Sequence, residues 1–156
     1  MRKATFSIAH KDEAMVALIQ ATDQKTLAVW AIDCAERVLH YFEKQFPEDQ
    51  RPRRAIEALQ VWLQTGVFTM AGIRKASLDS HAAARDVGAD TAARSAARAA
   101  GQAVATAHVP SHAYGSAVYA QQAIYRAANP AEADAAAARE RDWQYNHLLQ
   151  FRENNP

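Results

Sequence analysis

The stretch that decides the fold is an alanine-rich run, Ala92-Ala-Arg-Ser-Ala-Ala-Arg-Ala-Ala-Gly-Gln-Ala-Val-Ala-Thr-Ala107. Alanine is the strongest helix former, and the run contains no proline. At 100° per residue, its alanines cover one broad face, and Arg94, Arg98 and Gln102 lie on the other. We therefore expect a helix over about residues 90–109, whose small side chains let neighbouring helices approach closely.

Helix breakers divide the rest of the chain into similar segments. They predict seven helices, at about residues 12–21, 24–45, 52–66, 69–87, 90–109, 111–128 and 131–152. No useful length of sequence alternates with a period of two, so we expect no sheet. Because the links are short, neighbouring helices should be mostly antiparallel. The predicted fold class is all-α, either a single-domain bundle or a short α-solenoid-like stack.

Several predicted boundaries have a local physical cause. Pro52 stands at a helix start, where its missing N–H costs nothing. Gly88 suits the left-handed conformation that closes a helix. We expect Asp90 and Ser111 to cap the helices that follow them, because their side-chain oxygens can accept from free N–H groups.

The length and composition of the chain limit its domain count and the kinds of function it can have. The 156 residues predict one all-α domain over 1–156, with an N-terminal lead-in at 1–11 and a flexible tail at 153–156. A formal net charge of +1 argues against a general nucleic-acid binder. Cys34 is the single cysteine, so no internal disulfide can form. No segment resembles a signal peptide or a membrane helix, and we expect a cytoplasmic protein.

The segment 24–45 carries the first candidate site. Its apolar residues, including Cys34, cover about half of the helical wheel, so it should be a central helix. On the remaining arc, Asp33 and Arg37 are four residues apart, as are Glu36 and His40. That spacing predicts pairs within the helix. They form either a solvated stripe, which the sequence favours, or a charged site.

A second set of polar residues lies within residues 69–109. Arg74, Leu78, His81 and Arg85 share one side of a helix at the border of its apolar face. Polar groups at such a border pair with a neighbouring helix, so His81 and Arg85 are expected to join Asp33 or Glu36, in a structural network or a pocket. Arg94 and Arg98 should form an exposed ion-pair face with Asp90.

The sequence contains no convincing metal or catalytic motif. His108 and His112 have a metal-ligand spacing, but Pro110 interrupts the helix between them. Neither a glycine-rich phosphate loop nor a GxSxG motif is present. We predict no metal and no cofactor. Near the end of the chain, Trp143 should dock the last helix. Glu140 and Gln144, one turn apart, either lie on an exposed charged face, which the sequence favours, or reach a polar site.

Two blocks carry a resemblance to a known family. They are Trp30-Ala-Ile-Asp-Cys-Ala-Glu-Arg-Val-Leu39 and Arg51-Pro-Arg-Arg-Ala-Ile-Glu-Ala58. Later pieces agree: His81-Ala-Ala-Ala-Arg85, the alanine-rich run up to His108, and Ala117-Val-Tyr-Ala120. The chain resembles, over about residues 27–145, bacterial immunity proteins similar to the fifth class of polymorphic-toxin immunity proteins. Gln102 departs from the pattern, standing where relatives have histidine.

The resemblance implies an all-α protein that binds and neutralises a bacterial toxin without catalysis. It implies no catalytic residues. The polar positions that match the family pattern are candidate binding residues: Asp33, Glu36, Arg53, His81, Arg85 and His108.

Two other readings stay open on the residues alone. The first is a small enzyme or ligand-binding protein, in which Asp33, Glu36, His81, Arg85 and His108 converge in a pocket between helices. The second is a homodimer that uses the tyrosines of residues 111–128 and the alanine faces. A cognate toxin remains the first expected partner, and neither membrane nor nucleic acid is expected.

Overall fold

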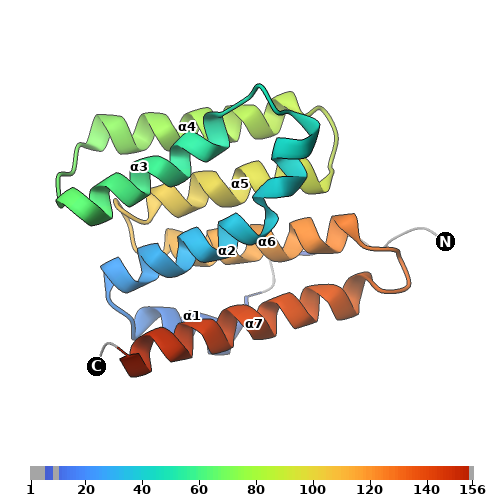
Figure 1. Ribbon diagram of the computed structural model, residues 1–156. Helices are drawn as coiled ribbons and strands as arrows, with labels where there is room; N and C mark the ends of the chain where they lie inside the picture. The colour runs from blue at the N-terminus through green and yellow to red at the C-terminus, as the bar shows by residue number, and fades with distance from the viewer. Residues whose placement is uncertain (1–5, 9–10, 155–156) are drawn as a thin grey trace.

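The computed structural model describes residues 6–8 and 11–154. Within these residues the chain forms seven α-helices and no strand, which confirms the all-α prediction (Figure 1). The helices are α1 (Glu13–Gln20), α2 (Gln24–Gln45), α3 (Arg51–Thr65), α4 (Met70–Asp86), α5 (Ala92–Ala105), α6 (His112–Ala127) and α7 (Ala133–Asn154).

The helices pack in three layers. Figure 1 shows α3 and α4 together at one side, α2, α5 and α6 in the middle, and α1 with α7 at the opposite side. The alanine-rich α5 is the central element, because it contacts α2, α3, α4 and α6. The turn from α3 to α4 and the turn from α5 to α6 lie at the same end of the molecule (Figure 1).

The core combines small side chains from α5 with large ones from its neighbours. Eight alanine and valine residues of α5 are buried, at positions 93, 96, 97, 99, 100, 103 and 104 and, just beyond the helix, 107. An alanine buries little area by itself, so most of the apolar area comes from other elements. Trp30, Leu39 and Phe42 of α2 and Ile56 of α3 are among the largest fully buried side chains.

The local signals at the helix ends are confirmed in part. Pro52 lies in the first turn of α3, and Gly66 and Gly88 adopt positive φ angles of 70° and 79° after α3 and α4. Asp90 does not cap α5, because the helix begins one residue after Thr91. Instead its carboxylate accepts from Arg94, 2.8 Å away. Ser111 occupies the N-cap position of α6 but makes no side-chain capping bond.

Asp12, just before α1, joins the N-terminal part of the chain to α7. Asp12 caps α1 by accepting from the Met15 N–H, and it also forms a salt bridge of 2.6 Å with Arg141 of α7. α7 extends to Asn154, two residues beyond its predicted end, so the predicted tail at 153–156 starts too early. Residues 1–5, 9–10 and 155–156 lie outside the described residues. No described helix is long and apolar enough to cross a membrane.

Candidate functional site

The polar residues of α2 are held by two different neighbours. Asp33 lies 2.8 Å from the Nε2 atom of His147 on α7. Glu36 accepts from Arg53 of α3 at 2.8 Å, and Arg53 also binds Glu43. The predicted pairs within α2, Asp33 with Arg37 and Glu36 with His40, are therefore wrong. The long side chains of His147 and Arg53 reach from neighbouring helices and bind Asp33 and Glu36 in place of residues of α2 itself.

His81 of α4 has its partner on α5. The Nη1 atom of Arg98 lies 3.0 Å from its Nδ1 atom. A guanidinium only donates, so Nδ1 is the acceptor and Nε2 carries the proton. Burial lowers the pKa of His81 to about 4, and the nearby charges of Arg98 and Arg85 act in the same direction. At neutral pH the imidazole is uncharged.

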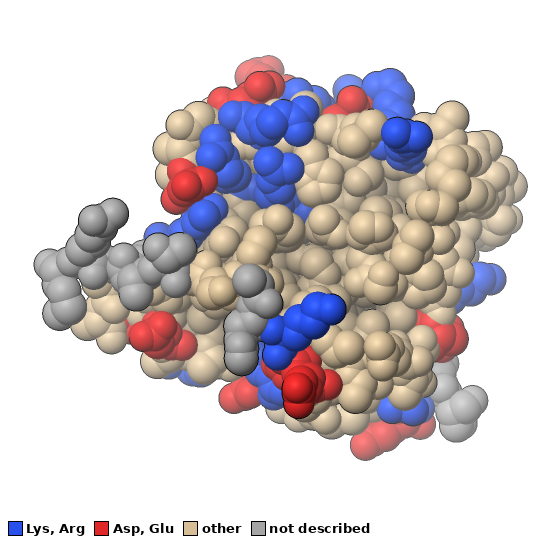
Figure 2. Space-filling model, turned by 180° about the vertical axis from the view of Figure 1, so that it is seen from behind, with Lys and Arg blue, Asp and Glu red and all other residues tan. Residues whose placement is uncertain are grey.

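Arg98 and Arg85 lie beside His81. Together with Arg94 and Arg126, which lie beside Asp90, we call these guanidinium groups the arginine patch. Asp90 faces Arg94 at 2.8 Å and Arg126 at 3.8 Å. The neighbouring carboxylate of Asp86 is turned to Arg51 instead. Seen from behind, the molecule shows Lys and Arg side chains gathered at the upper left, with acidic side chains along the edge of this group (Figure 2).

His108 lies apart from His81, at the rim of a groove of about 330 Å³. We call this the α4–α5 groove; it is lined by Met70, Ile73, Arg74, Ser77, Leu78, Ala105 and His108. The imidazole of His108 stacks on Phe68, with ring centroids 6.4 Å apart. The groove is therefore mostly apolar, with one cationic and one imidazole group at its edge.

Exposed apolar side chains surround the groove. Met70 and Leu78 line it and are 45% and 54% exposed, and Phe68 is 41% exposed beside His108. Val67 and Val109, next to Phe68 and His108 in the chain, are also exposed. The groove and these five residues (Val67, Phe68, Met70, Leu78 and Val109) form what we call the end surface. Contiguous exposed apolar surface of this kind marks interaction sites.

The predicted pocket of Asp33, Glu36, His81, Arg85 and His108 does not form. Asp33 binds α7, Glu36 binds α3, and His81 binds α5. His108 lies on the α4–α5 groove. Within the part of the chain that the structure describes, no group of three or more His, Cys, Asp or Glu residues is arranged to hold a metal ion.

One comparison with known proteins finds a match. Residues 17–151 match the family described as "Imm-5 like putative immunity protein". The chain belongs to this family. The match covers α2 to α6 completely, the second half of α1 and most of α7. No curated protein and no solved structure matches the chain at a significant level.

The sequence did not reveal the polar core of this Imm-5-like protein. Glu140 and Gln144, expected on an exposed face, are buried. Both carboxylate oxygens of Glu140 accept from Arg37, at 2.7 and 2.9 Å. Gln144 donates to the Ala117 carbonyl and accepts from Gln121. The one signal for this burial in the sequence was that Glu140 and Gln144 are four residues apart and close to Trp143. That spacing places both on one face of the helix, beside the aromatic residue expected to pack against the rest of the fold.

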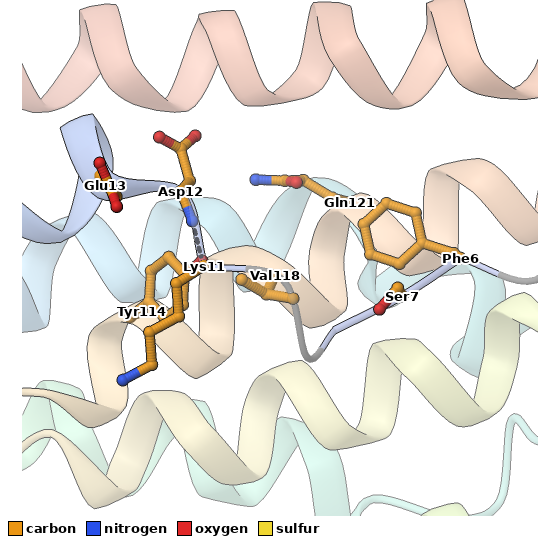
Figure 3. A pocket seen from close by; sticks show the side chains of 8 residues that line it. All are labelled: Phe6, Ser7, Lys11, Asp12, Glu13, Tyr114, Val118 and Gln121. Carbon is orange, nitrogen blue, oxygen red and sulfur yellow. Dashed lines mark hydrogen bonds between the residues drawn. The ribbon is translucent and has the colours of Figure 1, made fainter.

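A cleft of about 690 Å³ in this Imm-5-like protein lies between the N-terminal segment and α6. Figure 3 shows the Asp12 carboxylate pointing towards α7 and the Lys11 side chain pointing to the other side. The Asp12 N–H donates to the Tyr114 hydroxyl at 2.9 Å. The Asp12 carboxylate is already paired with Arg141 of α7.

Proposed function

We propose that this protein binds a cognate bacterial toxin and neutralises it by occupying the toxin's surface, without catalysis. Its family membership supports an immunity role, and the end surface is the observation that carries the proposal. We further propose that it acts in the cytoplasm, as a single copy bound to one toxin.

The end surface has the composition of a protein-binding site. Interfaces concentrate their binding energy in a few aromatic and long apolar side chains that fill pockets, surrounded by a polar rim. Phe68, Met70 and Leu78 supply such side chains around a groove, and Arg74 and His108 supply polar groups at the rim. The groove is small, so it fits one side chain of a protein partner.

The experiment is a survival assay in bacteria. Candidate toxin domains from the organism that makes this protein are expressed with and without this chain, and growth is measured. We expect growth to be restored for one toxin, and the purified pair to elute as a one-to-one complex in size-exclusion chromatography. A Leu78→Asp variant should lose both effects while melting at an unchanged temperature.

The matched control is Val61→Asp. Val61 is 54% exposed, as Leu78 is, but it does not line the groove. This variant should protect as the unchanged protein does. Restored growth without a complex, or with the toxin chemically altered after purification, would contradict the proposal and point to an enzyme. Failure to protect against every candidate would also overturn it, and a dimer without a toxin would show that the end surface binds a second copy.

A further inference from the structure

We propose that the partner bound at this surface is acidic: a carboxylate-bearing protein segment lies along α4 and α5, with its carboxylates on Arg85 and Arg98 and an apolar side chain in the α4–α5 groove. The inference deepens the proposed function, on which it rests, by naming the chemistry of the partner.

The first observation is that Arg85 and Arg98 have no acidic partner among the described residues. Other arginines of the fold are neutralised: Arg37 by Glu140, Arg53 by Glu36 and Glu43, and Arg141 by Asp12. Arg85 is exposed and Arg98 half-buried. Their charges are therefore available to a carboxylate from outside.

The second observation is that Arg98 is fixed in place without being neutralised. Its guanidinium donates to the Nδ1 atom of His81, an uncharged acceptor at neutral pH. The imidazole in turn lies against Gly101, where an added Cβ would be 2.8 Å from Nε2. An arginine held in this way binds a carboxylate with less loss of side-chain freedom than a mobile one.

The third observation is that the arginine patch continues the groove. Arg74, Ser77, His81 and Arg85 follow one side of α4, and the first two line the groove. At 1.5 Å per residue, Arg74 and Arg85 are separated by about 16 Å along the helix. An extended segment spans that distance with about five residues. One short segment can therefore reach the apolar groove and both arginines.

The surroundings favour an acidic protein over a nucleic acid. Asp86 and Asp90 border the patch and are paired with Arg51 and Arg94, so unpaired positive charge does not continue past the two arginines. The chain as a whole carries a formal net charge of only +1. Nucleic-acid binding depends on many phosphate contacts, whereas a protein segment needs two carboxylates and one apolar anchor.

The test uses a defined probe, the acetylated and amidated peptide Leu-Glu-Glu-Glu-Glu-Glu. It is titrated into ¹⁵N-labelled full-length protein, and amide shifts are followed by NMR at low salt. We expect shifts on α4 and α5, and binding at least about tenfold weaker for a peptide with glutamine in place of glutamate. Raising the salt to about 0.3 M should weaken binding, because it screens exposed charges.

The decisive variant is Arg85→Gln with Arg98→Gln, which should also weaken binding of the acidic peptide at least about tenfold. Its matched control is Arg54→Gln with Arg139→Gln, which removes the same charge from exposed arginines of α3 and α7 that form no ion pair with any described residue. Because Arg98 contacts His81, Arg85→Gln is also measured alone, and it should weaken binding without changing the melting temperature.

Several outcomes would overturn the inference. They are equal binding of the glutamine peptide, shifts confined to other helices, or an unchanged affinity in the double variant. Inorganic phosphate that binds the patch as tightly as the peptide would show a small-anion site instead, and tighter binding of a single-stranded oligonucleotide would show a nucleic-acid site. A peptide that binds as expected while no toxin is neutralised would refute the proposed function alone.

Discussion

Gly101 lies in the middle of α5, where the absence of a side chain makes room for the imidazole of His81. A Cβ at this position would come within 2.8 Å of Nε2 and 3.0 Å of two ring carbons. The Gly101 carbonyl also accepts from the Ser77 hydroxyl at 2.9 Å. α4 and α5 therefore approach each other closely at this residue, and the approach sets the position of Arg98.

We expect Gly101→Ala to destabilise the fold by about 1–3 kcal/mol, the usual cost of overpacking, although alanine favours the helix. The free energy of unfolding is measured with urea. His81→Ala removes the ring that clashes, so the cost of Gly101→Ala should be much smaller in that background. Equal costs in both backgrounds would show that the ring does not set the spacing.

Stability should depend on His81 at mildly acidic pH. Its pKa is about 4 in the folded protein, below the ordinary value of 6.5. Between these values the unfolded chain binds a proton that the folded chain does not, so the free energy of unfolding falls as pH decreases from 6.5 towards 4. The pKa of His112 is lowered by burial as well and acts in the same direction.

The check compares the unchanged protein with His81→Gln at pH 7 and pH 5. The unchanged protein should lose more stability over this interval. The aspartates with lowered pKa values, Asp12, Asp23 and Asp49, lose their contributions below this interval and do not confuse the comparison. Parallel losses in the two proteins would contradict the expectation.

At the scale of residues, the sequence indicated which polar side chains lie at the border of the core. It did not indicate which of these side chains contact one another. The 4-3-4 spacing predicted that His81 contacts a neighbouring helix, and it does. Its partner, Arg98, was expected on an exposed face with Asp90, because spacing along one helix carries no information on the rotation of the next. Asp33 and Glu36 were assigned to partners on their own helix for the same reason.

At the scale of elements, α7 shows how a helix with a weak apolar face is held. Its buried contacts include Leu148 and Ala137, but also Glu140 and Gln144. Glu140 is 5% exposed and accepts from Arg37, and the Arg37 guanidinium lies 3.7 Å from the centroid of the Trp143 ring. The Trp30 indole donates to the Gln144 carbonyl at 2.8 Å. Polar contacts thus fix the register of α7 on α2.

We expect Arg37→Met to destabilise the protein by about 1–3 kcal/mol, because it leaves a buried carboxylate without a cation. The figure is below that of a fully buried pair, since the Arg37 side chain is 41% exposed. Urea unfolding measures the change in the free energy of unfolding.

The control is Lys75→Met, which breaks an exposed pair with Asp79 on α4. It should change stability by less than about 0.5 kcal/mol. If the two variants were equally stable, the Arg37–Glu140 pair would have no structural role.

The number and order of the helices were predictable, because proline, glycine and alanine act locally. The exact start of α5 was not, because both Asp90 and Thr91 are plausible caps and Asp90 is used by Arg94. The burial of one side of α7 was missed because its charged residues resemble those of a solvated helix. Only the contact with Arg37 of α2 shows which charged residue of α7 is buried.

At the scale of the whole molecule, one large apolar cluster joins residues of α1 to α7. A smaller cluster of Tyr125, Ala133 and Ala137 lies beside it, near the turn from α6 to α7. A continuous core of this kind favours cooperative unfolding. We therefore expect the layers in Figure 1 to unfold together as one unit.

We expect a single two-state transition on heating, with an unfolding enthalpy of about 110 kcal/mol near 60 °C from the usual value per residue. Far-UV circular dichroism and tryptophan fluorescence should give the same midpoint, because Trp30, Trp62 and Trp143 belong to three different helices. A fluorescence transition that precedes the loss of helicity would show that one layer separates first.

The fully buried Cys34 has a practical consequence for all of these measurements. Its side chain is 0% exposed on α2, and burial raises the pKa of the thiol, so the reactive thiolate is scarce at neutral pH. Because the chain has no other cysteine, one introduced at Val67 would be the only thiol open to a maleimide dye. A fluorophore could thus be attached to the end surface without first replacing the native cysteine.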